Sequence, residues 1–270
     1  MSISTKRVGA TGWGLVLAGA VSFGTVSLRA QRLQEGQRSG LIDLKAAPVR
    51  LDEHADEKGF ESLFNGKDLV GWDGNRKLWS VKEGAITGQT TPENPATVNT
   101  FLVWTNGTVG DFELRCAFKL VPNNPQGFAN SGIQYRSKIL DPANWVVGGY
   151  QADMEAGPNY TGILYEERMP RQIMAQRGEK VVWDKDCKKQ VVGSVGEAAA
   201  IEAGVRKGDW NDYIIIAKDN HLQQFINSKP TVDVTDDCEK LRATNGVLAL
   251  QLHVGQPFTV QFKDIRIKKL

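Results

Sequence analysis

The chain has 270 residues, of which 41% are hydrophobic and 24% are charged, and its formal net charge is only +2. These values are near the average for soluble globular proteins and supply enough apolar material for one large domain. Because lysine and arginine are scattered rather than clustered, the composition argues against a nucleic-acid partner.

The N-terminus predicts a secretory signal peptide over residues 1–30. Lys6 and Arg7 precede a run from Val8 to Leu28 that carries no charge before its small-residue end. Frequent glycine makes this run a poor transmembrane helix, and an uncleaved N-terminal anchor is the alternative. We therefore expect a periplasmic or secreted protein without stable membrane insertion after cleavage.

The rest of the chain divides into a leader and one β-rich domain. Residues 31–58 are polar, charged and aperiodic, which predicts a flexible leader. Over residues 59–270 short β-rich segments recur between turn residues such as Glu83-Gly84, and only the segment 193–204 is compatible with a short helix. This pattern predicts an all-β sandwich of two antiparallel sheets.

The three cysteines have different expected environments. One strand-like segment carries four side chains in its apolar phase, and all four are expected in the core: Phe112, Leu114, Cys116 and Phe118. Cys187 and Cys238 fall in polar loops, where an exported location permits a disulfide between them.

Metal-binding signals are weak throughout the sequence. The histidines have no metal-like spacing to one another or to the cysteines, so we predict no zinc site and no cofactor. A structural calcium ion is left open, but its acidic candidates Asp233, Asp236 and Asp237 are too loosely spaced to predict a site.

Long polar side chains alternate with apolar ones in three predicted strands. The polar positions are Gln151, Asp153 and Glu155 in one strand, Gln134 and Arg136 in a second, and Gln251 and His253 in a third. In a two-sheet sandwich the apolar faces meet in the core, so these polar faces are expected to point outward and line a groove. Such a groove suits a polyhydroxylated ligand, whereas an ordinary solvated strand face is the alternative.

Four segments together resemble the 3-keto-disaccharide hydrolase domain family. They are GFESLFNGKDLVGW (59–72), NSGIQYRS (130–137), GYQADM (149–154) and GDWNDY (208–213), and the resemblance extends from about residue 60 to the end of the chain. It implies a concanavalin A-like jelly roll, export, and action on sugars whose C3 hydroxyl has been oxidised to a ketone.

The chain departs from this family's pattern in two places. Many members have Tyr-Glu-x-Gln where this chain has YQAD at residues 150–153, so the acid moves two residues along the same strand face, to Asp153. Where relatives often have an Asn-Gly turn, this chain has Asn227-Ser228, and we expect a substrate-facing loop to differ there.

The chemistry that the resemblance implies defines the candidate site. A C3 ketone acidifies the hydrogen on C2, so cleavage needs a base, a group that stabilises the enolate oxygen and a proton donor for the leaving oxygen. Asp153 and His253 are the candidate proton-transfer groups, and Arg136 is the candidate enolate stabiliser. The candidates for substrate binding are Gln134, Gln151, Gln251, Glu155, Tyr165, Glu167 and, for stacking on a sugar ring, Trp145 and Tyr160.

Two other functions are compatible with the same sequence. A carbohydrate-binding module without catalysis would use the same fold and groove. A retaining glycosidase would need two carboxylates about 5 Å apart, which Asp153 and Glu155 fit only loosely along a strand. The amide of Gln151, at another position on that strand face, cannot act as a nucleophile.

Overall fold

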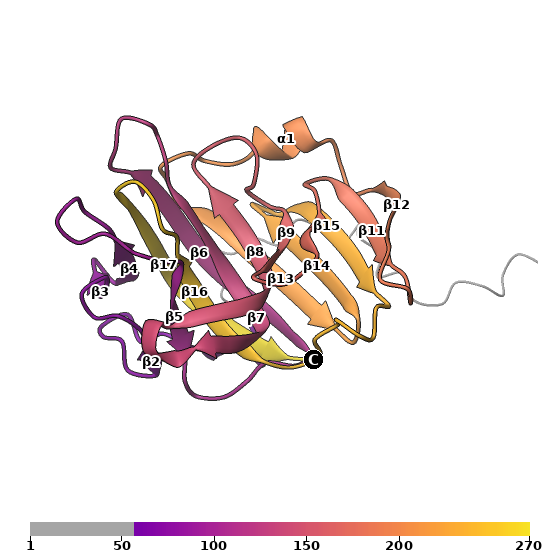
Figure 1. The fold of residues 1–270 in the computed structure, drawn as a ribbon, viewed down its shortest axis with the longest axis horizontal. Helices are drawn as coiled ribbons and strands as arrows, with labels where there is room; N and C mark the ends of the chain where they lie inside the picture. The colour runs from indigo at the N-terminus through magenta and orange to yellow at the C-terminus, as the bar shows by residue number, and fades with distance from the viewer. Residues whose placement is uncertain (1–56) are drawn as a thin grey trace, which may run out of the picture. The chain divides into compact units, whose positions relative to one another are not determined.

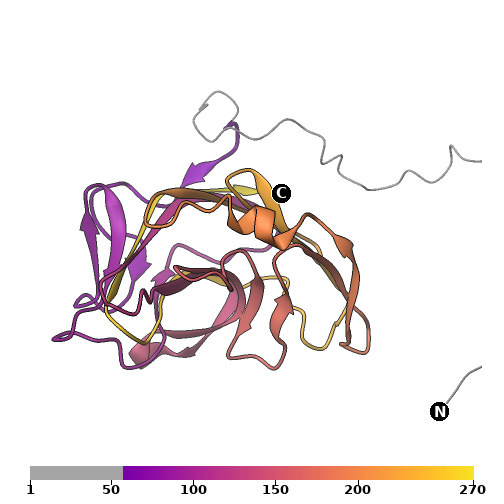
Figure 2. The ribbon, with the colours of Figure 1, turned by 90° about the horizontal axis from the view of Figure 1, so that it is seen from above.

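The computed structural model describes residues 57–270, so the predicted signal peptide and nearly all of the predicted leader lie outside the described residues. Two β-sheets stack face to face, as Figure 1 and Figure 2 show. No helix of the described part is long and apolar enough to cross a membrane.

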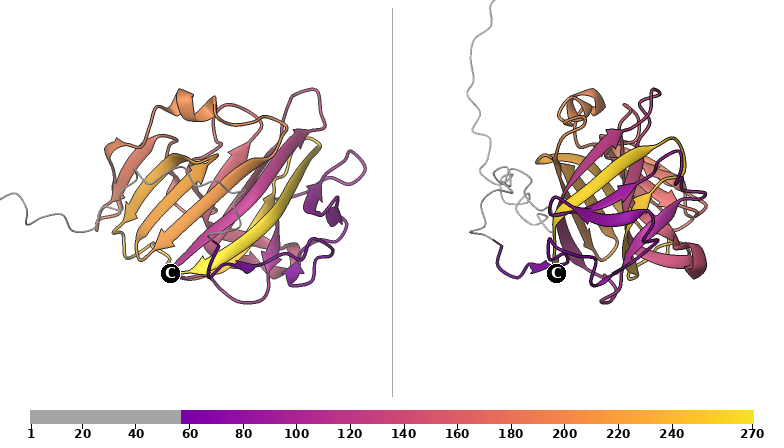
Figure 3. Two further views of the ribbon diagram at one scale, coloured as in Figure 1. Left: turned by 180° about the vertical axis from the view of Figure 1, so that it is seen from behind. Right: turned by 90° about the vertical axis from the view of Figure 1, so that its left-hand side faces the viewer.

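The larger sheet has ten strands, and Figure 3 shows it from behind. In spatial order they are β12 (Lys189–Ser194), β11 (Glu179–Trp183), β15 (Lys229–Asp236), β14 (His221–Ile226), β13 (Asn211–Lys218), β6 (Phe112–Pro122), β17 (Phe258–Lys269), β4 (Ala85–Gln89) and β3 (Trp79–Lys82), with β1 (Glu61–Ser62) paired to β17.

The smaller sheet has seven strands. In spatial order they are β10 (Gln172–Ala175), β9 (Leu164–Glu167), β8 (Val146–Glu155), β7 (Asn130–Asp141), β16 (Val247–Leu252), β5 (Thr100–Trp104) and β2 (Trp72–Asp73). Among residues 57–270 the helical segments are the 3-10 helix η2 (Pro142–Asn144) and the five-residue α-helix α1 (Ala198–Glu202), the latter within the segment where a short helix is expected.

The apolar faces of the two sheets meet in the core, as strand alternation predicts. On β6 the side chains of Phe112, Leu114, Cys116 and Phe118 are buried in the main apolar cluster. Glu113 and Arg115 take the other face of the strand, where the Arg115 Nε donates to the Glu113 Oε1 at 2.7 Å. The predicted sandwich and the predicted facing of β6 are confirmed.

One strand pair within this sandwich is parallel rather than antiparallel. The chain passes from the small sheet to the large sheet between β10 and β11, and β11 then lies parallel to β15. Cys187, after β11, and Cys238, after β15, form a disulfide that ties the two ends together.

The β7–β8 hairpin bends over the outer face of the small sheet. At its tip the Trp145 carbonyl accepts from the Phe101 N–H at 3.0 Å, and the Asn144 carbonyl accepts from the Thr100 hydroxyl at 3.0 Å. This fold-over buries a second apolar cluster, made of Phe101, Val103, Val147 and Ala249. Part of the outer face is therefore covered, and the polar side chains of β7 and β16 become buried with it.

Candidate functional site

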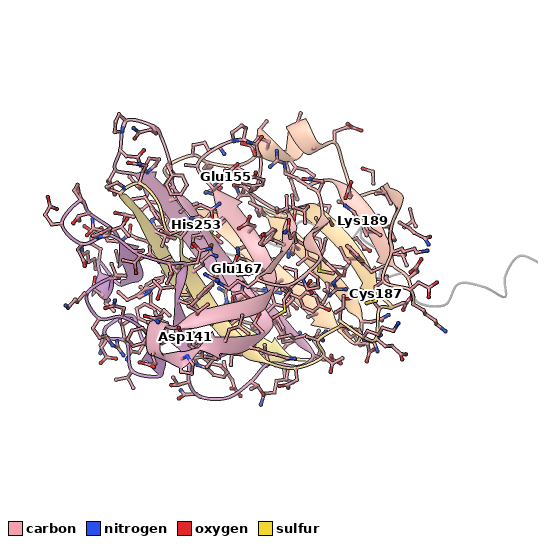
Figure 4. All side chains as sticks on the ribbon, in the orientation of Figure 1. Asp141, Glu155, Glu167, Cys187, Lys189 and His253 are labelled. Atoms are coloured by element: carbon pink, nitrogen blue, oxygen red, sulfur yellow. A yellow bond between two sulfur atoms is a disulfide. The ribbon has the colours of Figure 1, made fainter. Side chains whose placement is uncertain are left out.

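A pocket of about 470 Å³ opens beside the covered part of the small sheet. It is lined by side chains from β7, β8, β9, β10 and neighbouring loops: Asn99, Asn130, Gln151, Asp153, Tyr160, Ile163, Tyr165, Glu167, Arg168, Gln172, Ile173 and His253. Figure 4 labels His253 and Glu167 on the face of the small sheet that is turned toward the viewer. The structure therefore brings six predicted site residues together: Gln151, Asp153, Tyr160, Tyr165, Glu167 and His253.

Strand register explains why residues distant in sequence meet here. Gln151 and Asp153 alternate along β8 on one face, and Gln151 lies directly opposite Tyr165 of β9. Glu167 follows two residues later on the same face of β9. Consequently these four side chains form one wall of the pocket.

The Asp153 carboxyl is the most perturbed acid of the pocket. Its residue is only 5% exposed, and burial raises the pKa of this carboxyl well above its usual range. The negative charges of Glu155 and Glu167 raise the pKa further, against a hydrogen bond from the Gln151 amide at 3.0 Å that lowers it. A carboxyl in this setting holds its proton to higher pH and can serve as an acid.

A buried amide network lies beneath Asp153. The Gln134 Nε2 donates to the Gln151 Oε1 at 2.7 Å, and the Ser137 hydroxyl donates to the Gln134 Oε1 at 2.6 Å. Gln134 and Gln251 are fully buried and do not line the pocket, so their prediction as readers of sugar hydroxyls is corrected. The cause is the fold-over of the β7–β8 hairpin, and the role it leaves to Gln134 is to orient Gln151.

Gly132 leaves the space that the Gln151 side chain occupies. Gly132 lies directly opposite Asp153 on β7, and a Cβ placed there would come within 2.5 Å of the Gln151 Cδ. A side chain at this position would displace Gln151 from both Gln134 and Asp153.

Replacing Gly132 with Ala is therefore expected to lower catalytic turnover about five- to tenfold, since one positioned hydrogen bond is worth about 1 kcal/mol. Steady-state kinetics would measure this. Gly193→Ala is the matched control, because a Cβ at Gly193 meets nothing nearer than the Lys180 Cβ at 3.7 Å. Equal turnover of the two variants would contradict the positioning role of Gln151.

His253 follows the end of β16 and is held from two sides. Its Nδ1 lies 2.5 Å from the Val254 carbonyl, and its ring packs edge-on against Phe128 with centroids 5.8 Å apart. Because a carbonyl can only accept, Nδ1 is the donor in this contact, and Nε2 is the ring nitrogen left for other partners. These contacts fix the orientation of the His253 ring beside the pocket.

Asn99 links Val254, the residue after His253, to Glu167 of β9. Its Oδ1 accepts from the Val254 N–H at 2.9 Å, and its Nδ2 donates to the Glu167 Oε1 at 3.0 Å. The same carboxylate has the Arg168 Nε 3.7 Å away. These contacts fix the Glu167 carboxylate at the pocket wall.

Arg136 does not join the other predicted catalytic residues. A bulge shifts the β7–β8 register between Tyr135 and Lys138, and Arg136 has a left-handed φ of 49°. Its guanidinium crosses to the large sheet and donates to the carbonyls of Gly110 and Asp219 at 2.7 Å each. The predicted convergence is therefore wrong for Arg136, because the bulge breaks the alternation on which it rested.

The Arg136 guanidinium also pairs with the Asp111 carboxylate at 2.8 Å and is itself fully buried. Its described contacts tie β7 to the loops of the large sheet. Among the residues that line the pocket, the guanidinium is supplied by Arg168 instead.

Two other predicted substrate contacts lie outside the pocket lining. Trp145 caps η2 at the hairpin tip, where its indole Nε1 donates to the Asp73 carboxylate at 2.9 Å. The Glu155 carboxylate accepts from the backbone N–H groups of Asn159 and Tyr160 at 2.5 and 2.7 Å. Trp145 and Glu155 therefore do not line this pocket, and the Glu155 carboxylate holds the backbone of a neighbouring loop.

Sequence reasoning missed several lining residues, chiefly Asn99, Arg168 and Gln172. Arg168 and Gln172 both have a left-handed φ, 53° and 52°, at the two ends of the β9–β10 connection. The run Glu166-Glu167-Arg168 reads as a solvated loop end in sequence, and nothing in the pattern around Asn99 marks it as a site residue.

The carboxylates of two residues considered for a structural calcium ion bind other side chains. The Asp236 carboxylate accepts from the Arg171 guanidinium at 2.8 Å, and the Asp233 carboxylate binds His221 at 3.0 Å and Gln223 at 2.9 Å. Within residues 57–270 no group of three or more His, Cys, Asp or Glu side chains is arranged to hold a metal ion. The Asn227-Ser228 turn does not line the pocket either.

Residues 59–268 match the domain family described as 3-keto-alpha-glucoside-1,2-lyase-like. The chain belongs to this family. This is a carbohydrate-active, lyase- or hydrolase-like family, which implies a sugar ligand. No curated protein matches the chain significantly.

Solved structures similar to this family member agree on the fold. Two proteins from Parabacteroides distasonis that are assigned to the glycosyl hydrolases are similar to it, at 21% and 18% sequence identity and TM-scores of 0.51 and 0.50. The first match covers 83% of this chain and 99% of the other, and the second covers 78% and 99%. At this level of identity the likeness extends to the two-sheet sandwich alone.

Proposed function

We propose that this protein is an exported enzyme that cleaves 3-keto-glycosides by eliminating the group on C1 and then adding water. The observation that carries the proposal is that one pocket is lined by both the buried Asp153 carboxyl and the His253 imidazole. Proton abstraction and leaving-group protonation require a base and an acid, and we assign these roles to His253 and Asp153 respectively.

The elimination proceeds through an enolate. The His253 Nε2 removes the proton from C2, which the C3 ketone acidifies, and negative charge develops on the ketone oxygen. The C3 carbonyl then re-forms, the C2–C3 electron pair of the enolate becomes the C1–C2 double bond, the C1–O bond breaks, and the leaving oxygen takes the Asp153 proton. Water then adds to C1 with the two groups in exchanged roles, which restores both protonation states.

The developing enolate needs a positive or hydrogen-bonding partner. Arg168 takes this role in place of Arg136, because it supplies the guanidinium that lines the pocket. Its side chain is 43% exposed and lies 3.7 Å from Glu167, so it keeps freedom to reach a ligand oxygen.

Other lining groups are assigned to substrate hydroxyls. Gln151, Glu167 and Asn99 present amide and carboxylate atoms to the pocket, and Tyr165 adds a phenol. Burial raises the pKa of the Tyr165 phenol, and Glu167 and Asp153 raise it further, so the phenol stays protonated as a donor.

The two carboxylates considered for a retaining glycosidase, Asp153 and Glu155, do not both line the pocket, where the second carboxylate is that of Glu167. Glu155 accepts two backbone N–H groups and does not line the pocket. The non-catalytic binding module is distinguished by experiment rather than by geometry.

The test is to incubate the purified protein with a 3-keto-disaccharide and with its unoxidised parent, and to follow release of reducing sugar. We expect release from the oxidised sugar alone. Release from the parent would favour a conventional glycosidase, and binding of the oxidised sugar without release would favour the binding module.

Export remains part of the proposal and is supported by the Cys187–Cys238 disulfide, which oxidising compartments favour. We expect the exported form to lack about the first 30 residues. Mass spectrometry of the exported protein checks this, and an intact Met1 in membrane fractions would indicate the anchor instead.

A further inference from the structure

The loop that joins β8 to β9 carries an exposed tyrosine at the rim of the pocket. Tyr160 is 42% exposed yet lines the pocket, whereas Asp153 on the pocket wall is 5% exposed. Immediately after Tyr160 the chain returns to the strand, and the Gly162 N–H donates to the Asp153 carbonyl at 3.0 Å. Tyr160 therefore stands at the outer end of the pocket that begins at Asp153.

The backbone of this rim loop (residues 156–161) is held from several sides. The Glu155 carboxylate accepts from the N–H groups of Asn159 and Tyr160. Arg177 donates to the carbonyls of Thr161 and Pro158, at 2.8 Å each. An exposed loop with so many charge-assisted contacts has little freedom, which is what a rigid ligand platform requires.

The segment around α1 supplies the remaining support. Lys207 donates to the Gly157 carbonyl of the rim loop at 2.6 Å, and the Glu202 carboxylate pairs with Lys207 at 2.7 Å. The other Glu202 oxygen lies 3.0 Å from the Arg177 Nη1. Figure 1 shows α1 at the end of the sheets where β8 terminates. The Glu202 carboxylate thus pairs with both Arg177 and Lys207, which donate to the carbonyls of the rim loop.

We infer that Tyr160 is the stacking platform for the sugar ring that leaves, and that Glu202 is a positioning residue for it. The inference rests on the proposed function, because cleavage requires the C2 hydrogen and C1 oxygen of the oxidised ring to reach the buried Asp153 side of the pocket. The ring attached through C1 must then extend toward the rim, where a flat phenol face is available. A saccharide leaving group should therefore gain affinity from Tyr160, whereas a small alkyl leaving group should not.

The test compares binding of two ligands to proteins in which turnover is slowed. In the Asp153→Asn background, calorimetric titration measures affinity for a 3-keto-disaccharide and for the methyl 3-keto-glucoside. Adding Tyr160→Ala should weaken disaccharide binding about three- to tenfold, the size of one aromatic stacking contact, and leave the methyl glycoside unchanged. Tyr160→Phe should restore the affinity because it keeps the ring.

Adding Glu202→Gln should weaken disaccharide binding in the same direction, because an amide cannot pair with both Arg177 and Lys207. Glu179→Gln is the matched control, since the Glu179 carboxylate also pairs with a lysine, Lys189, at 2.7 Å and is 25% exposed. It should leave both affinities unchanged.

Equal losses for the two ligands, or no loss from Tyr160→Ala, would overturn the inference, as would failure of the Asp153→Asn protein to bind either ligand. Turnover by the unsubstituted protein tests the proposed function separately. Binding that depends on Tyr160 without any turnover would support the platform and refute the enzyme.

Discussion

Replacing Asp153 with Asn is expected to lower turnover of a 3-keto-glycoside by about 100-fold or more, the usual contribution of a positioned acid or base. The amide has the size of the carboxyl but cannot donate its proton to the leaving oxygen. Sugar binding should persist, because the neighbouring hydroxyl readers are unchanged. Single-turnover kinetics at saturating substrate would measure the loss, and full activity of this variant would contradict the assignment.

The same substitution is expected to stabilise the fold at neutral pH. The folded-state pKa of Asp153 is raised, so the unfolded chain releases this proton near its ordinary value of 3.8 while the folded protein retains it. The stability that this group contributes is therefore complete below that value and is lost as pH rises toward the folded pKa. In denaturant unfolding at several pH values, the free energy of unfolding of Asp153→Asn should rise relative to that of the unsubstituted protein from acid to neutral pH.

Asp233→Asn is the matched control, because it should change the stability at neutral pH in the opposite direction. Burial raises the Asp233 pKa, but hydrogen bonds from His221 and Gln223, with the charges of His221 and Lys180, lower it on balance. Its contribution is present above the unfolded pKa and lost on acidification, so Asp233→Asn should be destabilised at neutral pH. If both variants moved in the same direction, burial of Asp153 would not be the source of its raised pKa.

Strand alternation predicted the fold and one wall of the site. The apolar phase of β6 identifies its core residues, and the polar phase of β8 puts Gln151 and Asp153 on one outward face. The family resemblance supplied the sheet in which His253 of a distant segment could reach them. These predictions succeed because period-two alternation holds wherever a strand stays regular.

Irregular backbone explains the predictions that failed. A bulge in β7 sends Arg136 to the other sheet, and the bent β7–β8 hairpin buries Gln134 and Gln251 and places Trp145 outside the pocket lining. A bulge adds one residue to a strand without a sequence signature that alternation can detect. Arg168 lies in a connection with left-handed backbone, where strand periodicity carries no information.

The Cys187–Cys238 disulfide is connected to the pocket wall through a chain of buried polar contacts. The Cys238 N–H donates to the Asp236 carboxylate at 3.1 Å, and the same carboxylate binds Arg171, whose guanidinium also pairs with Glu166 of β9. Glu166 lies between the pocket residues Tyr165 and Glu167 on the opposite face of the strand. The crosslink therefore fixes the end of a buried ion network that reaches the wall of the pocket.

Removing this disulfide is expected to lower the free energy of unfolding by about 4 kcal/mol, from the loop entropy of a crosslink that spans 51 residues. Denaturant unfolding of Cys187→Ala/Cys238→Ala would measure it, and a reductant should destabilise the unsubstituted protein but not this variant. Cys116→Ala is the control, because Cys116 is a buried free cysteine and its loss should leave the sensitivity to reductant intact. A reductant-insensitive unsubstituted protein would show that the crosslink does not constrain the unfolded chain, and with it the argument for an oxidising compartment would weaken.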